Sequence, residues 1–241
     1  MDILSQAGTP LNNPDGAPVN PAVRHWRPVV LVLLAPSLAV LAVAASQEPS
    51  FGWDRALAAW LLGFSTPAYD AFMEAVSFPG EYAMVIVTML MGAALAAWRL
   101  GWRAGLLVVV GLGVMGLNEA FKDVVDRPRP LEDPTGGGES FPSGHTMHAI
   151  LTSGLLWLLV APKLKALSHR RVLLVAVLVW PVLVGVSRVH LERHWPSDVL
   201  GAYLFGAAVI IAMAWVWPRL QQAAFPLLPT PGEGPAGESA P

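Results

Sequence analysis

Three short polar clusters interrupt an otherwise apolar chain, and their residue types are those needed to hold a phosphate and transfer it. The first cluster runs from Lys122 to Pro130, the second from Phe141 to His145 and the third from Ser187 to Asp198. Together they contain cations, a serine hydroxyl, a glycine and two separated histidines, one of which has a carboxylate nearby. Such groups can hold phosphoryl oxygens and provide a nucleophile or an acid. The clusters therefore predict phosphate chemistry if the fold brings them together.

The first cluster places two guanidinium groups on a stiff segment. Arg127 and Arg129 each precede a proline, which favours an extended conformation of the residue before it. Arginine suits bidentate phosphate contacts, and lysine acts as a point charge. Lys122 alone is also consistent with a cation that stabilises the C-terminal end of a helix, and a basic patch with lipid headgroup binding. These alternatives stay open for this cluster taken alone.

The second cluster predicts an anion site at the start of a helix. Ser143 and Gly144 come just before the apolar run Thr146–Ala161. Serine is a favoured N-cap residue, glycine allows a close approach of the backbone to a ligand, and a helix N-terminus offers free N–H groups to an anion. The alternative is a plain serine cap before a membrane helix, with His145 as an interfacial residue.

The third cluster adds the group that could react. His194 lies just before Pro196, which suits the first position of a helix, and Asp198 then falls in the first turn of that helix. A carboxylate paired with an imidazole can fix its tautomer and stabilise its charged form. An aspartate in a first turn is also often a residue that only compensates the helix dipole. Arg188, at the end of the preceding apolar run, supplies a further cation.

The elements that must position these clusters are membrane helices. The 241 residues are 54% hydrophobic and 13% charged, whereas soluble domains carry about 25% charged residues. A membrane helix needs about 20 mostly apolar residues, and the apolar runs here lack the alternation of barrel strands. The sequence predicts an all-α fold, an integral membrane bundle of six transmembrane helices over residues 28–46, 81–98, 103–121, 145–161, 172–189 and 199–217.

The distribution of lysine and arginine predicts the orientation of this bundle. With the N-terminus in the cytoplasm, the cytoplasmic segments carry nine of these cations and the outer segments six, five of which lie in the clusters. This topology predicts a multi-pass protein of the cell (inner) membrane with all three clusters on the extracytoplasmic side. Residues 53–64 and 68–76 are expected to form short amphipathic helices in the first outer loop. Segments 1–27 and 220–241 are expected to be disordered cytoplasmic tails of a membrane domain that spans residues 28–219.

Some residue types are missing or fall outside the clusters' pattern. No cysteine is present, which excludes disulfides, thiolate metal sites and a catalytic thiol. Arg127 is expected either to help bind a second phosphate or to lie at the surface. His148, one turn beyond His145, is expected to pack in the core, and His190 to lie at the membrane interface.

The three clusters resemble, in order and spacing, the signature of the type 2 phosphatidic acid phosphatase superfamily, in its membrane lipid phosphatase branch. That signature is Lys-x6-Arg-Pro, then Pro-Ser-Gly-His, then Ser-Arg-x5-His-x3-Asp. Here it is matched by Lys122 to Pro130, by Pro142 to His145 and by Ser187 to Asp198, with every spacing kept. Three ordered motifs are a specific signal, whereas Pro-Ser-Gly-His alone is not.

The resemblance implies a role for each matched residue. His194 would attack phosphorus to give a phosphohistidine, and Asp198 would orient it. His145 would protonate the leaving oxygen and then activate the water that hydrolyses the intermediate. This chemistry needs positioning and positive charge, so no metal or cofactor is expected. The phosphoryl oxygens would be held by Lys122, Arg129, Ser143, Gly144 and Arg188.

The function favoured by these observations is a membrane lipid phosphatase, a hydrolase of a phosphoric ester or acid anhydride. Its partners would be the bilayer and a lipid phosphate, not a nucleic acid. Undecaprenyl diphosphate is the first choice of substrate, and phosphatidate or phosphatidylglycerol phosphate the alternative. The six spans argue against a vanadate-dependent haloperoxidase, and the complete set of histidines and cations argues against a lipid-phosphate-binding scaffold. A transporter is disfavoured because the clusters lie at helix ends, not at the bilayer midplane.

Overall fold

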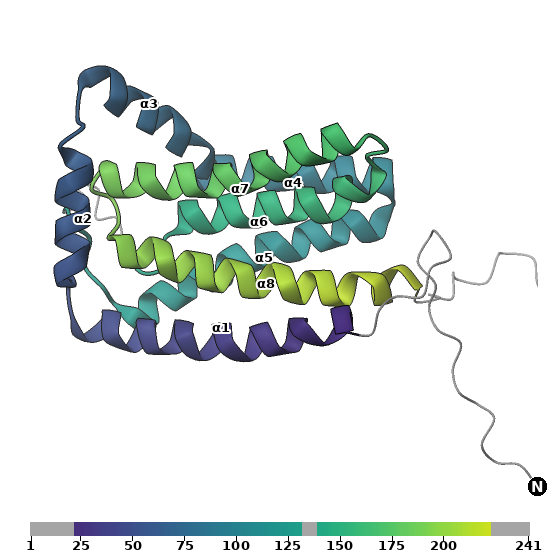
Figure 1. Cartoon of the computed structure of the whole chain (residues 1–241), viewed down its shortest axis with the longest axis horizontal. Helices are drawn as coiled ribbons and strands as arrows, with labels where there is room; N and C mark the ends of the chain where they lie inside the picture. The colour runs from purple at the N-terminus through teal and green to yellow at the C-terminus, as the bar shows by residue number, and fades with distance from the viewer. Residues whose placement is uncertain (1–21, 132–138, 223–241) are drawn as a thin grey trace, which may run out of the picture.

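Six long helices run side by side along the length of the molecule (Figure 1). The computed structural model describes residues 22–131 and 139–222, and within these ranges the chain contains helices and no strand. Each of the six helices is long and apolar enough to cross a membrane, which confirms the predicted all-α bundle of six spans. They are α1 (Ala22–Gln47), α4 (Tyr82–Leu100), α5 (Trp102–Val125), α6 (Gly144–Val160), α7 (Leu167–His190) and α8 (Pro196–Gln222).

The helices extend beyond several of the predicted spans. Helix α1 begins at Ala22, and α5 continues to Val125, so that Lys122 lies in its last turn. A short 3-10 turn, η2 (Ala161–Lys163), follows α6. The predicted tails lie for the most part outside the described residues, and α1 and α8 take up residues 22–27 and 220–222 as helix.

The chain between α1 and α4, residues 48–81, forms two shorter helices as predicted. These are α2 (Gly52–Leu62) and α3 (Pro67–Ser77), which is followed by the 3-10 turn η1 (Phe78–Gly80). The Thr66 hydroxyl accepts a hydrogen bond from the N–H of Tyr69 and so caps α3, and Pro67 suits the first position of that helix. Helix α2 lies across the ends of the long helices (Figure 1). We call residues 48–81 the α1–α4 connection.

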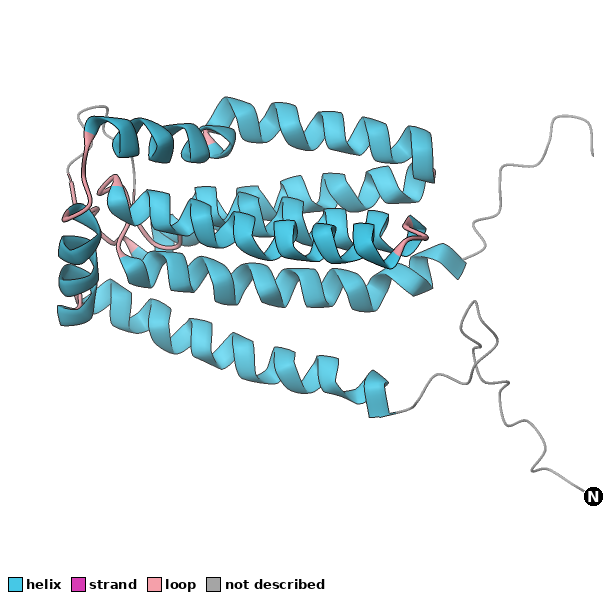
Figure 2. Cartoon of the chain, turned by 45° about the horizontal axis from the view of Figure 1, so that its top comes forward, coloured by secondary structure: helices cyan, strands magenta, loops and turns pink. Residues whose placement is uncertain are grey.

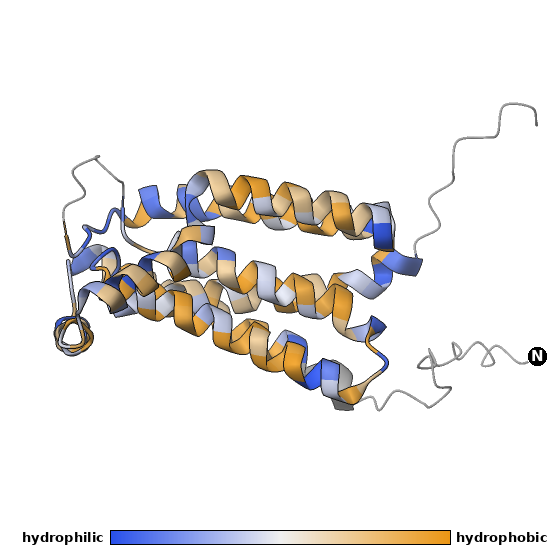
Figure 3. Cartoon of the chain, turned by 90° about the horizontal axis from the view of Figure 1, so that it is seen from above, coloured by the Kyte–Doolittle hydropathy of each residue, from blue (hydrophilic) through white to orange (hydrophobic). Residues whose placement is uncertain are grey.

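Apolar side chains cover much of the outside of the bundle, as a membrane requires. Val32, Val40 and Val175 are among the large apolar residues exposed along the spans. Hydrophobic residues occupy the middle of the helices and hydrophilic residues gather near their ends (Figure 3). In a bilayer this surface would contact lipid, while the helices satisfy their own backbone hydrogen bonds.

Helix α6 is the most buried of the six spans, because 56% of the residues in its apolar stretch lie inside the protein. Glycines allow it to approach α8 closely. A Cβ atom on Gly154 would lie 2.5 Å from the Ile210 side chain, and one on Gly206 would lie 2.7 Å from Ile150. Small residues at helix crossings are typical of membrane bundles. This packing fixes the direction of α6 and therefore the place of its N-terminus.

The three polar clusters meet at one end of the bundle. The last turn of α5, the start of α6, the end of α7 and the start of α8 all lie at the end that α2 covers (Figure 1). Helix α3 and most of the loops gather there as well (Figure 2). We call this end of the molecule the site end.

Candidate active site

A cavity of about 1280 Å³ opens at the site end, and residues of all three clusters line it. Of the eight predicted site residues, six line this cavity directly. Ser143 and Asp198 lie just behind its wall, and both are fully buried. The six that line the cavity are Lys122, Arg129, Gly144, His145, Arg188 and His194.

The cavity has a polar part and an apolar part. The polar part is formed by the clusters, and Arg193, which the sequence analysis did not select, also lines it. The apolar part is formed by α4 and α5 and includes Val85, Ile86, Leu112 and Met115. The cavity therefore joins a cationic site to an apolar wall made of two membrane-spanning helices.

His194 lies in the loop between α7 and α8, and its orientation is set by the backbone. Its Nδ1 atom is 2.8 Å from the carbonyl oxygen of Ser140. A carbonyl can only accept, so Nδ1 carries the hydrogen and Nε2 keeps its lone pair. Burial, helped by the nearby cations Arg188, Arg129 and Lys122, holds the pKa of His194 well below its ordinary value. The residue is therefore a neutral imidazole whose Nε2 carries the lone pair.

Asp198 contacts His194 less directly than the sequence analysis expected. Its Oδ2 atom is 3.7 Å from Nδ1 of His194, beyond hydrogen-bond distance. The same oxygen accepts hydrogen bonds from the N–H of Trp195, at 2.7 Å, and from the hydroxyl of Ser140. Asp198 thus holds Trp195, which follows His194 in the chain, and Ser140, whose carbonyl orients the ring of His194.

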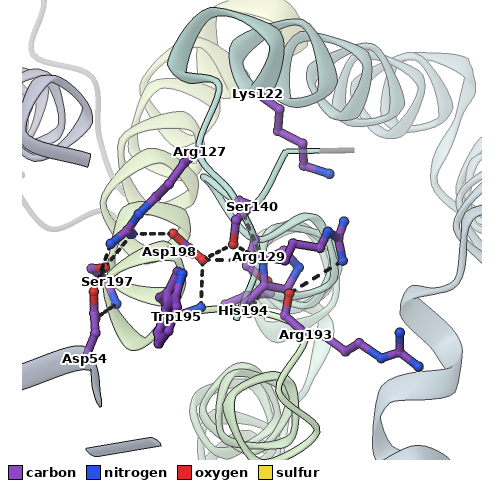
Figure 4. A network of polar contacts seen from close by, with 12 residues as sticks. Asp54, Lys122, Arg127, Arg129, Ser140, Arg193, His194, Trp195, Ser197 and Asp198 are labelled. Atoms are coloured by element: carbon purple, nitrogen blue, oxygen red, sulfur yellow. Dashed lines mark hydrogen bonds and ion pairs between the residues drawn. The ribbon is translucent and has the colours of Figure 1, made fainter. Parts of the chain in front are cut away.

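Arg127 lies in a buried ionic network behind the cavity (Figure 4). Its Nη1 atom donates to Asp198 at 2.6 Å, and its Nη2 atom donates to Asp54 of α2 at 2.9 Å. Nη1 also donates to the Ser197 hydroxyl at 2.6 Å. Arg127 is 1% exposed and Asp54 is 0% exposed. The structure therefore gives Arg127 neither the surface position nor the phosphate contact that the sequence analysis considered.

The second cluster brings the start of α6 close to the cation of α5. Ser143 precedes the first residue of α6, and its hydroxyl accepts a hydrogen bond from Thr146 at 3.0 Å. A Cβ atom on Gly144 would lie 3.3 Å from Glu119 and 3.5 Å from Nζ of Lys122. A side chain at this position would make an ordinary contact with Lys122 and would press on Glu119, and glycine keeps the start of α6 open to a ligand.

His145 faces the cavity from the first turn of α6. Its Nε2 atom is 3.2 Å from a carboxylate oxygen of Glu81, at the end of the α1–α4 connection. Gly80 packs against the imidazole, because a Cβ atom there would lie 2.5 Å from its Cδ2 atom. Two neighbouring residues of the connection therefore determine where this imidazole lies.

Carboxylates and hydroxyls contact the cations of the cavity. Lys122 is 2.9 Å from both carboxylate oxygens of Glu119, and Arg188 donates to the hydroxyl of Ser77. Lys122 and Arg188 are both buried. Both contacts are of the kind that phosphate oxygens can make instead.

The other two histidines near the clusters stabilise the packing. His148 is buried, and its Nε2 atom is 3.1 Å from the Thr88 hydroxyl, as expected for a core residue. His190 is buried too, instead of facing the membrane interface. Its two ring nitrogens lie 2.7 Å from Asp70 and 3.2 Å from the carbonyl of Leu61. It thereby joins α7 to both short helices of the connection.

Two contributors to the site were not identified from the sequence. Asp54 occupies a first-turn position of α2, where it also accepts a hydrogen bond from the N–H of Phe51 at 3.1 Å. In sequence it is indistinguishable from an ordinary capping carboxylate. Ser140 contributes its backbone carbonyl as well as its hydroxyl. The only feature of the sequence that could have pointed to Ser140 is its position next to the second cluster. Within the described residues, no group of three or more His, Asp or Glu side chains has a geometry that could hold a metal ion.

Known proteins match both the sequence and the fold. The sequence model of the PAP2 superfamily matches residues 103–222. Phosphatidylglycerophosphatase B of Bacillus subtilis is 29% identical over 186 residues, which cover 75% of this chain and 90% of that protein. An undecaprenyl-diphosphatase of Sulfolobus acidocaldarius is 29% identical over 136 residues, which cover 53% of this chain and 60% of that protein.

A solved structure matches the arrangement of the helices. The crystal structure of a transmembrane PAP2-type phosphatidylglycerolphosphate phosphatase from Bacillus subtilis superposes with a TM-score of 0.67. It is 26% identical and covers 80% of this chain and 98% of that chain. The six-span bundle is therefore similar in fold to a solved membrane phosphatase.

Proposed function

The chain belongs to the PAP2 superfamily and is a membrane lipid phosphatase, and from this premise we propose that it removes the terminal phosphate of phosphatidylglycerol phosphate or a closely similar lipid. The observation that carries the proposal is the composition of the cavity. Its cationic part suits a phosphate, while its apolar wall lies on α4 and α5, where lipid tails would be. A substrate with both parts would place its headgroup in the site without leaving the bilayer.

The geometry supports a reaction in two steps. In the first, Nε2 of His194 forms a bond to phosphorus as the bond to the leaving oxygen breaks, and His145 gives that oxygen its proton. In the second, His145 takes a proton from water, which attacks phosphorus and breaks the bond to His194. A covalent intermediate divides one difficult displacement into two easier ones.

The charge on phosphorus would be stabilised by groups already in place. Lys122, Arg129 and Arg188 line the cavity beside His194. The Gly144 N–H and the Ser143 hydroxyl lie at the start of α6. Fixed donors and cations of this kind stabilise a phosphoryl transition state without reorganisation during the reaction.

Carboxylates around His145 favour an alcohol as the leaving group. Glu81 contacts the imidazole, and Glu74 also lines the cavity. An alcohol oxygen, as in the glycerol of phosphatidylglycerol, can leave beside these groups and hydrogen-bond to them. A leaving phosphate, as in undecaprenyl diphosphate, would meet like charges there. This reverses the order of substrates favoured from the sequence.

Undecaprenyl diphosphate is the second candidate substrate. The cavity contains four cationic side chains, because Arg193 lines it together with Lys122, Arg129 and Arg188. Four cations are suited to a diphosphate as well as to a phosphomonoester. The similarity to an undecaprenyl-diphosphatase is consistent with this alternative.

We also propose that the site end faces the extracytoplasmic side of the cell membrane, with both termini in the cytoplasm. The opposite end carries Arg99 in the last turn of α4, Arg103 at the start of α5, and the basic residues of the segment 163–171, which runs from the end of α6 into α7. Such an excess of cations is typical of cytoplasmic loops. Attachment of a reporter enzyme to the α6–α7 loop should give cytoplasmic activity, and a periplasmic signal would reverse this orientation.

The test is phosphate release by the purified protein in detergent. Phosphatidylglycerol phosphate, phosphatidate and undecaprenyl diphosphate are compared at equal mole fraction, with His194→Ala as the control. We expect the highest kcat/KM on phosphatidylglycerol phosphate and no release by the variant. A preference for undecaprenyl diphosphate would establish the second candidate, and release that survives in His194→Ala would reject the mechanism.

A further inference from the structure

The buried ionic network contains charges that do not contact the cavity. Arg127 lies between the carboxylates of Asp54 and Asp198, and all three side chains are fully buried. Its remaining donor, Nε, binds the carbonyl of Pro49 at 3.2 Å, and its guanidinium lies 5.0 Å from the ring centre of Phe51. The donors of Arg127 are thus directed into the protein, away from a substrate in the cavity.

The network reaches His194 through the residues on either side of it. Arg127 holds one oxygen of Asp198, and the other oxygen holds the Trp195 N–H and the Ser140 hydroxyl. The Ser140 carbonyl in turn orients the ring of His194. A chain of short contacts therefore runs from the guanidinium to the nucleophile (Figure 4).

Asp54 fixes the other side of the guanidinium and the start of α8. Its Oδ1 atom accepts a hydrogen bond from the N–H of Ser197 at 2.8 Å, and its Oδ2 atom accepts one from the Ser197 hydroxyl at 2.7 Å. Ser197 directly precedes Asp198 in the chain. The α1–α4 connection thereby holds both the arginine and the helix turn that carries Asp198.

We propose that Arg127 and Asp54 are positioning residues for the nucleophile, which hold Asp198 and through it the His194 loop in the geometry required for attack on phosphorus. This inference rests on the proposed function, because it assigns His194 as the nucleophile. It extends that function to the connection, whose Asp54 carboxylate binds Ser197 in the catalytic motif from 143 residues away in sequence.

A purely structural role, in which the ion pair only attaches α2 to the bundle, makes different predictions. The charged or titratable groups that face His194 are Asp198 from α8, Arg188 from α7, Lys122 from α5, Arg129 from the segment after α5 and His145 from α6. Arg127 neutralises the first of these. Without it, the uncompensated carboxylate 3.7 Å from Nδ1 would favour the charged imidazole, and a structural attachment would have no such effect.

The two neutralising variants should therefore differ in the titration of His194. In Arg127→Gln, the titration of His194 should move up by about one pH unit or more. In Asp54→Asn, Arg127 keeps its charge and loses one of its two counterions. The ring of His194 should therefore stay neutral over a pH range at least as wide as in the wild type. Both variants should lower kcat by about 10- to 100-fold while KM changes little, as expected for loss of a partner that orients a reacting group.

The experiment combines kinetics with a titration that does not need turnover. The histidine rings are labelled with nitrogen-15 in the full-length protein in detergent, and the His194 signal is assigned by its loss in His194→Ala. Asp70→Asn is the matched control, because Asp70 lies in the same connection and binds His190, outside the network. We expect that control to retain the wild-type kcat and the wild-type His194 titration, with a lower melting temperature.

Each outcome decides the matter. A His194 titration that moves up in Arg127→Gln and does not move up in Asp54→Asn, with kcat lowered in both and the control normal, establishes the positioning role. An unmoved titration in Arg127→Gln, or equal losses in Asp70→Asn, overturns it. If Arg127→Gln does not fold, Arg127→Lys takes its place: because it keeps the charge, it should keep the wild-type titration of His194 while lowering kcat, and a wild-type kcat would overturn the positioning role. A wild type that releases no lipid phosphate rejects the proposed function, and the titration still tests the network.

Discussion

The two histidines of the cavity have opposite surroundings. His194 is 1% exposed, its Nδ1 is bound to a backbone carbonyl, and both neighbouring segments are held by one carboxylate. The side chain of His145 is 16% exposed, and it contacts Glu81, whose own side chain is 58% exposed. One imidazole is fixed by the interior of the protein, and the other is held at the cavity wall by an exposed carboxylate.

This difference corresponds to the two proposed tasks. A nucleophile must present one lone pair along one line to phosphorus, so freedom of its ring reduces the rate. An acid that protonates the leaving oxygen and then takes a proton from water must serve two positions in turn. A rigid hydrogen-bond network is therefore required behind His194, whereas the same rigidity around His145 would slow the reaction.

The largest effect is expected from the fixed histidine. In His194→Asn, hydrolysis should be abolished, because the substitution removes the imidazole that attacks phosphorus. The lipid should still bind, since the cations remain. Acid-quenched samples made with phosphorus-32-labelled substrate should contain phosphoenzyme in the wild type and none in the variant. Phosphorus-32-labelled protein in the variant would show that His194 is not the phosphorylated residue, and the contrast between the two histidines would fail.

His145→Ala should show a loss that depends on the leaving group. We expect a decrease of about 10²- to 10⁴-fold on a lipid substrate, as for loss of a general acid. With an aryl phosphate, whose leaving group needs no proton, the rate of the first step should decrease far less. The ratio of the two substrates' burst rates measures this. An equal loss on both substrates would show that His145 also acts as a fixed element.

A smaller effect is expected where the connection touches His145, the more exposed of the two histidines. In Gly80→Ala, the new methyl group would lie 2.5 Å from the His145 ring and would displace it. The control is Gly113→Ala in α5, where a Cβ atom meets nothing within 4 Å. We expect kcat to fall about 10-fold in the first variant, because misplacement of a reacting group is costly, and to stay at the wild-type value in the second. Equal activities would show that His145 tolerates displacement.

The smallest effect concerns stability against acid. The pKa of His194 lies well below its ordinary value in the folded protein, because the ring is buried near cations. The unfolded chain binds a proton at this residue below about pH 6.5, and the folded protein does not. Folding stability from this residue should therefore fall with decreasing pH, by up to about 1.4 kcal/mol per pH unit. In His194→Asn, the melting temperature should decrease less between neutral and mildly acidic pH than in the wild type.

The sequence allowed the spans and most of the cavity wall to be predicted for a physical reason. Long apolar runs have few alternatives in a bilayer, and the charged clusters at their ends cannot enter it. Because Lys122, Gly144, Arg188 and His194 all border helix ends, the bundle brings them together at one end. The cationic site follows from the order of the helices and the position of each motif along them.

The support behind the nucleophile could not be predicted in this way. Arg127 and Asp54 are separated by 73 residues, and a buried ion pair has the same residue types as an exposed one. The group that orients His194 is a backbone carbonyl, which every residue has and no sequence pattern marks. The motif places Asp198 near His194, but only the structure shows that it acts through Ser140 and Trp195.

The pairing of Lys122 with Glu119 has a consequence for the end of the catalytic cycle. Glu119 lies one helical turn before the lysine, and both of its oxygens are 2.9 Å from the ammonium group. When inorganic phosphate departs, the ammonium group of Lys122 still has a counterion, because the Glu119 carboxylate is already within hydrogen-bond distance. Release of the product is thus an exchange of one oxyanion for another, and free phosphate should be a weak inhibitor despite the strongly cationic site.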